Sequence, residues 1–210
     1  EATNGPVTVD AGTDATLGTV IAGNGTGTLT AGVDLTLNGD VSATNGDVLA
    51  TAGNNLDQFG NVTGDEVVMT AETGTLTSTA TVLANGNATL TAGLDINGSA
   101  PVTATAGDLT ATAGNDITFT NVLTAGTSVT VDGGGDVFLS EVNSQGGDAT
   151  LTAGLDMTLT GPVDANANDI VANAGNDMLV NAGLGTQDGN TNNITLSTDT
   201  GTISTTANGT

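Results

Sequence analysis

The stretch Asp148-Ala149-Thr150-Leu151-Thr152-Ala153-Gly154-Leu155-Asp156-Met157-Thr158-Leu159 decides the fold of this chain. Its small and apolar residues Ala149, Leu151 and Ala153 alternate with threonines, which is the period of a strand with one buried face. Glycine and aspartate then end the run as a turn does. Met157 and Leu159 begin a second alternation, with Thr158 directed outward. The stretch therefore predicts a strand, a turn and a second, shorter strand.

The Ala-Gly-x-Asp phrase of this stretch recurs along the chain at steps of 20 or 21 residues. Clear copies begin at Ala31, Ala92, Ala113, Ala153 and Ala174, a diverged copy begins at Ala11, and weaker copies lie at Ala52-Gly53 and Gly133-Gly134-Gly135-Asp136. A fixed period of this length is the signature of a repeat architecture.

A second apolar column keeps the same period and predicts a third strand in each unit. Its members are Ile21, Val41, Val62, Val82, Val102, Val122, Val142 and Val163. About ten units fit the chain, starting near residues 5, 25, 46, 65, 86, 107, 127, 147, 168 and 192. The last step is longer, and Thr186–Asn190 is interpreted as a small loop insertion.

Three short strands and three turns in each unit predict one rung of a parallel β-helix, or β-solenoid. A sandwich of hairpins has no reason to keep a strict period, whereas in a solenoid each residue stacks on its equivalent one rung away. We therefore expect an all-β, single-domain solenoid over residues 1–210, with about ten rungs of 20–21 residues. At about 4.8 Å per rung the rod is about 48 Å long.

The composition excludes several classes of function. The chain has 23 acidic residues and no Lys, Arg, His or Cys, for a formal net charge of −23. It therefore lacks the residues for a His- or Cys-based catalytic triad, a zinc site of the usual type, a Schiff base or an arginine clamp for phosphate. Nucleic acid would be repelled. Paired carboxylates could run a glycosidase or lyase, but such sites usually recruit basic or aromatic residues, so we expect no enzyme.

The chain has no run of 18 apolar residues, so we expect no membrane span. It begins at Glu1 and shows no signal peptide, so we expect a processed form or a piece of something longer.

The rung from Asp148 to Gly161 resembles repeats of the filamentous haemagglutinin-like adhesins, which are large secreted bacterial proteins with right-handed parallel β-helix shafts. The resemblance extends over nearly the whole chain, although the secretion domain of those adhesins has no counterpart in it. It implies a right-handed coil, which general chirality also favours, and an extracellular or cell-surface location.

One acidic column is a candidate metal site. Its members occupy the same position in five consecutive units: Asp95, Asp116, Asp136, Asp156 and Asp177. Carboxylates stacked about 4.8 Å apart repel each other by about 0.9 kcal/mol even in bulk water. A calcium ladder would offset this repulsion, because calcium prefers carboxylate and carbonyl oxygens. The alternative is that each carboxylate accepts backbone N–H bonds at a turn. A second, broken column has the same alternatives: Asp47, Glu66, Asn87, Asp108, Ser128, Asp148 and Asp169.

Outward threonine pairs form a second candidate surface. The pairs are Thr28/Thr30, Thr89/Thr91, Thr110/Thr112 and Thr150/Thr152, with interruptions at Leu49, Val68, Asp132, Val171 and Asn173. A flat face of such pairs is typical of ice-binding proteins, whereas the alternative is that threonine is simply a good exposed strand residue.

The pattern shows no capping helix at either end, and uncapped solenoid ends tend to pair with other chains. We therefore expect a non-enzymatic extracellular structural protein that stacks end to end into a homopolymeric filament. Its partners are then other copies of itself and, beyond them, cell-surface or matrix components. The alternatives are a shaft fragment of a large secreted adhesin and a calcium- or ice-binding β-helix.

Overall fold

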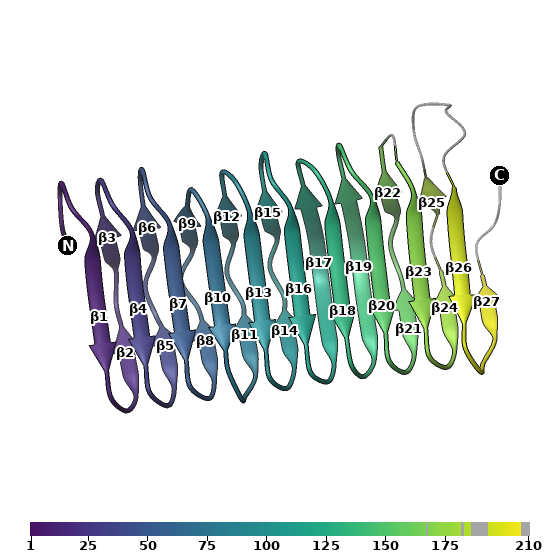
Figure 1. Cartoon of the computed structure of the whole chain (residues 1–210), viewed down its shortest axis with the longest axis horizontal. Helices are drawn as coiled ribbons and strands as arrows, with labels where there is room; N and C mark the ends of the chain where they lie inside the picture. Colours follow the sequence, from purple (N-terminus) through teal and green to yellow (C-terminus); the bar gives the residue numbers. More distant parts are fainter. Residues whose placement is uncertain (167, 182, 186–192, 207–210) are drawn as a thin grey trace.

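The computed structural model describes residues 1–166, 168–181, 183–185 and 193–206. These residues form a coil in which most turns contribute three strands, and every strand pairing among them is parallel (Figure 1). The loop insertion expected at Thr186–Asn190 and the unit start near residue 192 lie outside the described residues. The described part of the chain contains strands and turns but no helix, and so none that could cross a bilayer.

The first strand of each turn is five residues long, and these strands form one ten-stranded sheet, which we call the wide face. Its strands, in spatial and chain order, are β1 (Val7–Ala11), β4 (Gly27–Ala31), β7 (Val48–Ala52), β10 (Val67–Ala71), β13 (Ala88–Ala92), β16 (Leu109–Ala113), β18 (Val129–Gly133), β20 (Ala149–Ala153), β23 (Ile170–Ala174) and β26 (Ile194–Thr198).

The second and third strands of each turn form two narrower faces. The second face holds β2 (Ala15–Leu17), β5 (Leu35–Leu37), β8 (Leu56–Gln58), β11 (Leu76–Ser78), β14 (Ile96–Gly98), β21 (Met157–Leu159), β24 (Met178–Val180) and β27 (Ile203–Thr205). The third face holds β3 (Val20–Ala22), β6 (Val41–Ala43), β9 (Val62–Gly64), β12 (Val82–Ala84), β15 (Val102–Ala104), β22 (Val163–Ala165) and β25 (Leu184–Gly185). Two long strands, β17 (Ile117–Ala125) and β19 (Val137–Ser144), run across both faces and join them into one sheet.

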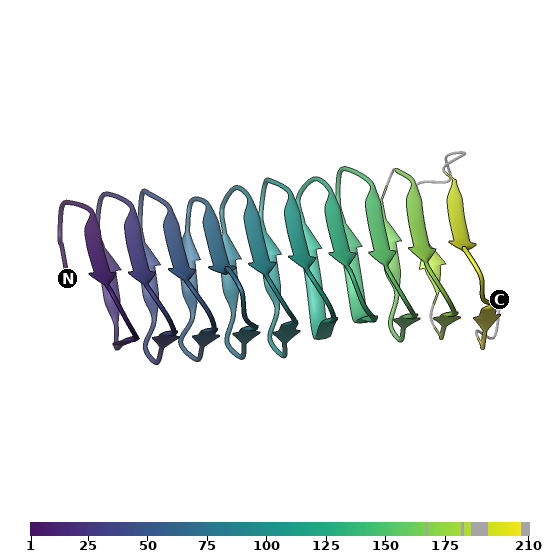
Figure 2. The ribbon, with the colours of Figure 1, turned by 60° about the horizontal axis from the view of Figure 1, so that its bottom comes forward.

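The coil makes about nine turns, because ten strands stacked in the wide face are separated by nine steps. The expectation of about ten rungs agrees with the ten strands of the wide face, one per rung, of which the last rung is represented by β26 and β27 among the described residues. In Figure 1 the near strands of the wide face run down and the fainter strands behind them run up while the chain advances from left to right. This sense of coiling is right-handed. Figure 2 shows the same succession of turns from below.

The core is a set of inward columns, each made of equivalent residues from successive turns. The alanines that open the recurring Ala-Gly-x-Asp phrase stack in one column, because the register pairs Ala31 with Ala52 and Ala153 with Ala174. The glycine that follows Ala153 also stacks closely on the turn before it: a Cβ on Gly154 would lie 2.1 Å from the carbonyl oxygen of Gly134. Only a residue without a side chain fits at that distance.

The apolar column of the third face is confirmed except at two members. Val20, not Ile21, pairs with Val41, and Leu123, not Val122, pairs with Val102 and Val142. The first correction reflects two adjacent apolar residues, of which Val20 is buried and Ile21 half-buried. The second reflects a register shift between Phe119 and Val122 in β17, after which Leu123, and not Val122, faces inward.

Among the described residues three polar side chains lie in the core, Gln58, Ser78 and Ser144, and each has a hydrogen-bond partner. Gln58 donates its Nε2 to the carbonyl oxygens of Gly60, at 2.7 Å, and Ala80, at 3.0 Å, while its Oε1 accepts the hydroxyl of Ser78 one turn on. The hydroxyl of Ser144 lies 2.6 Å from the carbonyl oxygen of Thr127. These bonds offset the desolvation cost of burying polar groups.

Candidate functional site

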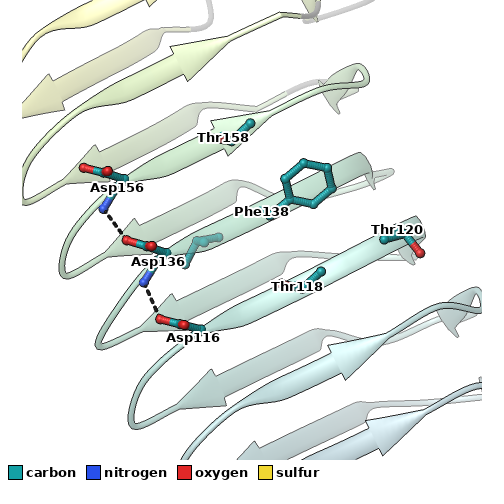
Figure 3. A pocket seen from close by; sticks show the side chains of 8 residues that line it. Asp116, Thr118, Thr120, Asp136, Phe138, Asp156 and Thr158 are labelled. Atoms are coloured by element: carbon teal, nitrogen blue, oxygen red, sulfur yellow. Dashed lines mark hydrogen bonds between the residues drawn. The ribbon is translucent and has the colours of Figure 1, made fainter.

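The five predicted aspartates lie in one line along the corner between the wide face and the second face. In this line the backbone N–H of each aspartate after Asp95 donates to the Oδ1 of the aspartate one turn before it. The distances are 3.1 Å for Asp116 to Asp95, 2.8 Å for Asp136 to Asp116, 3.1 Å for Asp156 to Asp136 and 3.0 Å for Asp177 to Asp156. Figure 3 shows the central part of this line, which we call the first-corner ladder. Each of the five carboxylates therefore accepts a backbone N–H, as the second alternative predicts.

The ladder extends beyond the aspartates, and asparagine replaces aspartate in it. The N–H of Asn55 donates to Asp34 at 3.0 Å, and that of Thr75 donates to the Oδ1 of Asn55 at 3.0 Å. Asn115 and Asn176, each preceding an aspartate, also donate their Nδ2 to the ladder at 2.8 Å. An amide oxygen therefore does the same work as a carboxylate oxygen, so the ladder needs an acceptor rather than a charge.

The other two corners carry ladders of the same kind. In the second, broken column, Glu66 donates to Asp47, Asp108 to Asn87, Ser128 to Asp108 and Asp169 to Asp148, each through its backbone N–H over 2.9–3.2 Å. At the corner between the second and third faces, the N–H of Asn61 donates to Asp40 at 2.8 Å. Sequence reasoning missed this third column, although Asp40, Asn61 and Thr81 keep the same period.

The calcium interpretation of the first-corner ladder stays one of the two alternatives. Among the described residues no group of three or more carboxylates is gathered so that it could hold a metal ion. The carboxylates are spaced along the rod, one per turn, so a bound ion would have to bridge neighbouring turns. One oxygen of each predicted ligand already accepts a backbone N–H, which leaves the second oxygen for any cation.

Hydrogen bonds from the next turn perturb the acidity of Asp108. Its Oδ1 accepts the hydroxyl of Thr127 and the backbone N–H of Ser128 from the next turn. The hydroxyl bond, and after it the backbone bond, lower the pKa of Asp108 below its ordinary value of 3.8, against a smaller opposing effect of burial. Both bonds favour the ionised form because a carboxylate is a better acceptor than a carboxylic acid.

A groove follows the second face beside the first-corner ladder. Its central hollow has a volume of about 550 Å³, with Asp116, Asp136 and Asp156 along one side and Phe138 between Thr118 and Thr158 (Figure 3). It shares Thr118 and Thr120 with one neighbouring hollow and Asp156 and Thr158 with another. The groove offers hydroxyl and carboxylate oxygens and one ring, but no histidine, lysine, arginine or cysteine with which to build most catalytic sites.

The register of the wide face brings the predicted threonine pairs together in two outward columns. The first runs Thr8, Thr28, Leu49, Val68, Thr89, Thr110, Thr130, Thr150, Val171 and Thr195. The second runs Asp10, Thr30, Thr51, Thr70, Thr91, Thr112, Asp132, Thr152, Asn173 and Ser197. The five interruptions expected from the sequence stand where it placed them.

Comparisons with known proteins provide no relative: no protein-family profile, curated protein or solved structure matches the chain. The resemblance to filamentous haemagglutinin-like adhesins therefore has no support beyond the repeated sequence segments themselves. The structure itself shows a parallel β-solenoid repeat protein of about nine turns.

Proposed function

We propose that this chain is a non-enzymatic, extracellular structural protein that associates end to end into a homopolymeric filament. The observation that carries the proposal is the state of the two end turns. β1 pairs only with β4, and β26 pairs only with β23, so each presents one unpaired edge among the described residues. Unpaired edges of parallel strands are templates for adding another strand.

The end turns also expose apolar side chains that every inner turn buries. Ile194 is 43% exposed, while Ile170, one turn earlier in the same column, is 0% exposed. Ile203 is 41% exposed, while Met178 beneath it is 1% exposed. At the other end Val7 and Val9 are only partly buried against the core. Covering these side chains by another turn would remove apolar area from water, which favours association.

The columns fix the register that such a junction would take. Ile194 belongs to the column that starts at Val7, and Leu196 belongs to the one that starts at Val9. A second copy set on the last turn would therefore place its Val7 over Ile194 and its Val9 over Leu196. The backbone hydrogen bonds between strands of the wide face would continue through the junction as they do inside the chain, so the junction would need no new kind of contact.

The charge of the chain works against this association and makes it sensitive to salt. Two rods of net charge −23 repel each other as they approach, and added salt screens the repulsion. Filament growth should therefore rise with ionic strength. The same repulsion disfavours random side-by-side clumping.

Negative-stain microscopy of the purified chain tests the proposal. We expect fibres far longer than the roughly 48 Å of a single rod, and more of them at high salt. Leu196→Asp, which places a charge in the junction, should abolish the fibres, whereas the matched Thr195→Asp, which points outward from the same strand, should keep them. Both variants must retain the melting transition of the native chain. Short, uniform particles of the native chain at all salt concentrations would contradict the proposal.

A shaft segment of a longer extracellular solenoid is the alternative, and the same open edges support it. In that case the edges pair with further turns of one long chain and not with copies. The microscopy separates the two: fibres far longer than one rod support the filament, and uniform short particles favour the shaft segment. Cell-surface or matrix components are proposed as further partners in either case.

A further inference from the structure

The wide face is the broadest of the three faces, and it is almost uncharged. The chain carries 23 carboxylates, yet the outward columns of this face hold only two of them, Asp10 in the first turn and Asp132. The remaining carboxylates lie mainly at the corners, where the ladders use them. The rod therefore presents a neutral sheet framed by acidic corners.

The neutral sheet is also the most regular surface of the molecule. All nine of its strand pairings hold five residue pairs each without a register shift. The second and third faces instead have mostly three-residue strands, one outward residue per strand and a shift in β17. In Figures 1 and 2 the strands of the wide face lie side by side along the whole rod.

Methyl groups and hydroxyls repeat in two dimensions on this sheet. Threonine fills seven of the ten positions of the first outward column and six of the ten in the second. The interruptions Leu49, Val68 and Val171 still carry methyl groups, so the first column is methyl-bearing throughout. In the second column Thr30, Thr51, Thr70, Thr91 and Thr112 follow one another without a break.

The two outward columns of the wide face form a grid, and the backbone sets the spacings of this grid. Neighbouring turns are about 4.8 Å apart, and the two outward residues of one strand are about 6.6 Å apart. Oxygen atoms in the prism planes of hexagonal ice repeat at comparable distances along two perpendicular directions. A rigid grid of hydroxyls and methyl groups can hold surface water in such a lattice, since the hydroxyls bond the water and the methyl groups order it between them.

A second copy of the chain fits this face less well than ice does. Two packed sheets exclude water and interdigitate apolar side chains. Facing threonine rows would bury many hydroxyls, and each buried hydroxyl without a partner costs free energy. An ice surface leaves every hydroxyl a water partner.

We propose that the wide face binds ice through the two outward columns centred on Thr89, Thr91, Thr110 and Thr112. The proposal does not depend on filament formation, because a single rod already carries the whole face.

Thermal hysteresis of the purified 210-residue chain in low salt tests the proposal. We expect a gap between melting and freezing points that grows with protein concentration, and faceted ice crystals. Thr91→Tyr, in the middle of the unbroken threonine run, should lose most of this gap, and Thr110→Tyr in the other column should do the same. Thr103→Tyr is the matched control, because Thr103 points outward from β15 on the third face.

Three outcomes would overturn the proposal. Hysteresis of the native chain at the level of buffer would remove ice binding altogether. Equal loss in Thr91→Tyr and Thr103→Tyr, with unchanged melting curves of both proteins, would show that the wide face is not the surface responsible. Lateral dimers of the native chain, dissolved by Thr91→Tyr and accompanied by no hysteresis, would identify a second copy as the occupant.

Discussion

The ring of Phe119 occupies the place where Gly98 lacks a side chain. A Cβ on Gly98 would lie 2.2 Å from Cδ1 of Phe119, and the two residues pair in register one turn apart in the same inward column. Phe119 is fully buried and is the largest side chain in the core. The glycine and the phenylalanine thus share the volume that two medium-sized side chains fill elsewhere in the column, where Leu139 stacks on Leu159.

Gly98→Ala should destabilise the solenoid by about 1–3 kcal/mol, the usual cost of overpacking a tight core. The free energy of unfolding from denaturant titration measures the effect. Phe119→Leu alone should cost about 1–2 kcal/mol, because it opens a cavity over Gly98. The double variant should be more stable than the sum of the two losses predicts, since each change relieves the other. Simple additivity would show that the ring does not depend on the missing side chain.

Gly154→Ala should be destabilising by at least about 1 kcal/mol, because its new Cβ would meet the backbone of Gly134 and not a movable side chain. Gly12→Ala is the matched control in the same column. A Cβ on Gly12 has no atom within 4 Å, because no earlier turn lies beneath it. Gly12→Ala should leave the melting temperature in low salt unchanged, since its free energy of unfolding should differ from that of the native chain by no more than about 0.5 kcal/mol. Equal effects of the two substitutions would contradict the close stacking.

Asp136→Asn should keep or raise the melting temperature. Asp136 accepts the N–H of Asp156 and donates its own to Asp116, and an amide oxygen serves the same purpose at Asn55. The change also removes repulsion from two neighbouring carboxylates. Asp136→Leu has a similar size but no acceptor, so it should cost about 1 kcal/mol. A loss in Asp136→Asn as large as in Asp136→Leu would mean that the charge itself is required.

Removal of calcium distinguishes the two accounts of the ladder. If hydrogen bonds alone hold it, a chelator leaves the melting temperature of the native chain unchanged, and this is the result we expect. A calcium ladder through Asp95, Asp116, Asp136, Asp156 and Asp177 would instead give a fall that added calcium reverses. Asp136→Asn should weaken that response, because it removes one ligand charge from the middle of the ladder.

The contribution of Asp108 to stability should depend on pH and on Thr127. Because its pKa is lower in the folded chain than its ordinary value of 3.8, its ionised form is favoured by folding. This contribution is fully present above pH 3.8 and is lost as the pH falls through the lower pKa of the folded state. Thr127→Val removes the first cause of the shift, so a carboxyl NMR titration should find the pKa of Asp108 moved back toward 3.8. An unchanged titration would show that the hydroxyl bond does not set it.

The sequence by itself determined the period, the three strands of each turn and most of the columns. Alternation in Ala149–Ala153 decides which side chains face inward, and repetition after 20 or 21 residues decides which of them stack. Both are local or periodic properties, and a parallel solenoid converts them directly into contacts between neighbouring turns.

Only the tertiary structure decided where a turn accommodates an additional residue and which hydrogen-bond partners the polar side chains have. Sequence could not choose between Val20 and Ile21, or between Val122 and Leu123, because both members of each pair are apolar and the choice depends on where a corner or register shift takes up one residue. Nor could it show which backbone N–H each aspartate accepts. The bonded N–H belongs to a residue 20 or 21 positions away, and its distance from the carboxylate exists only once the turns are stacked.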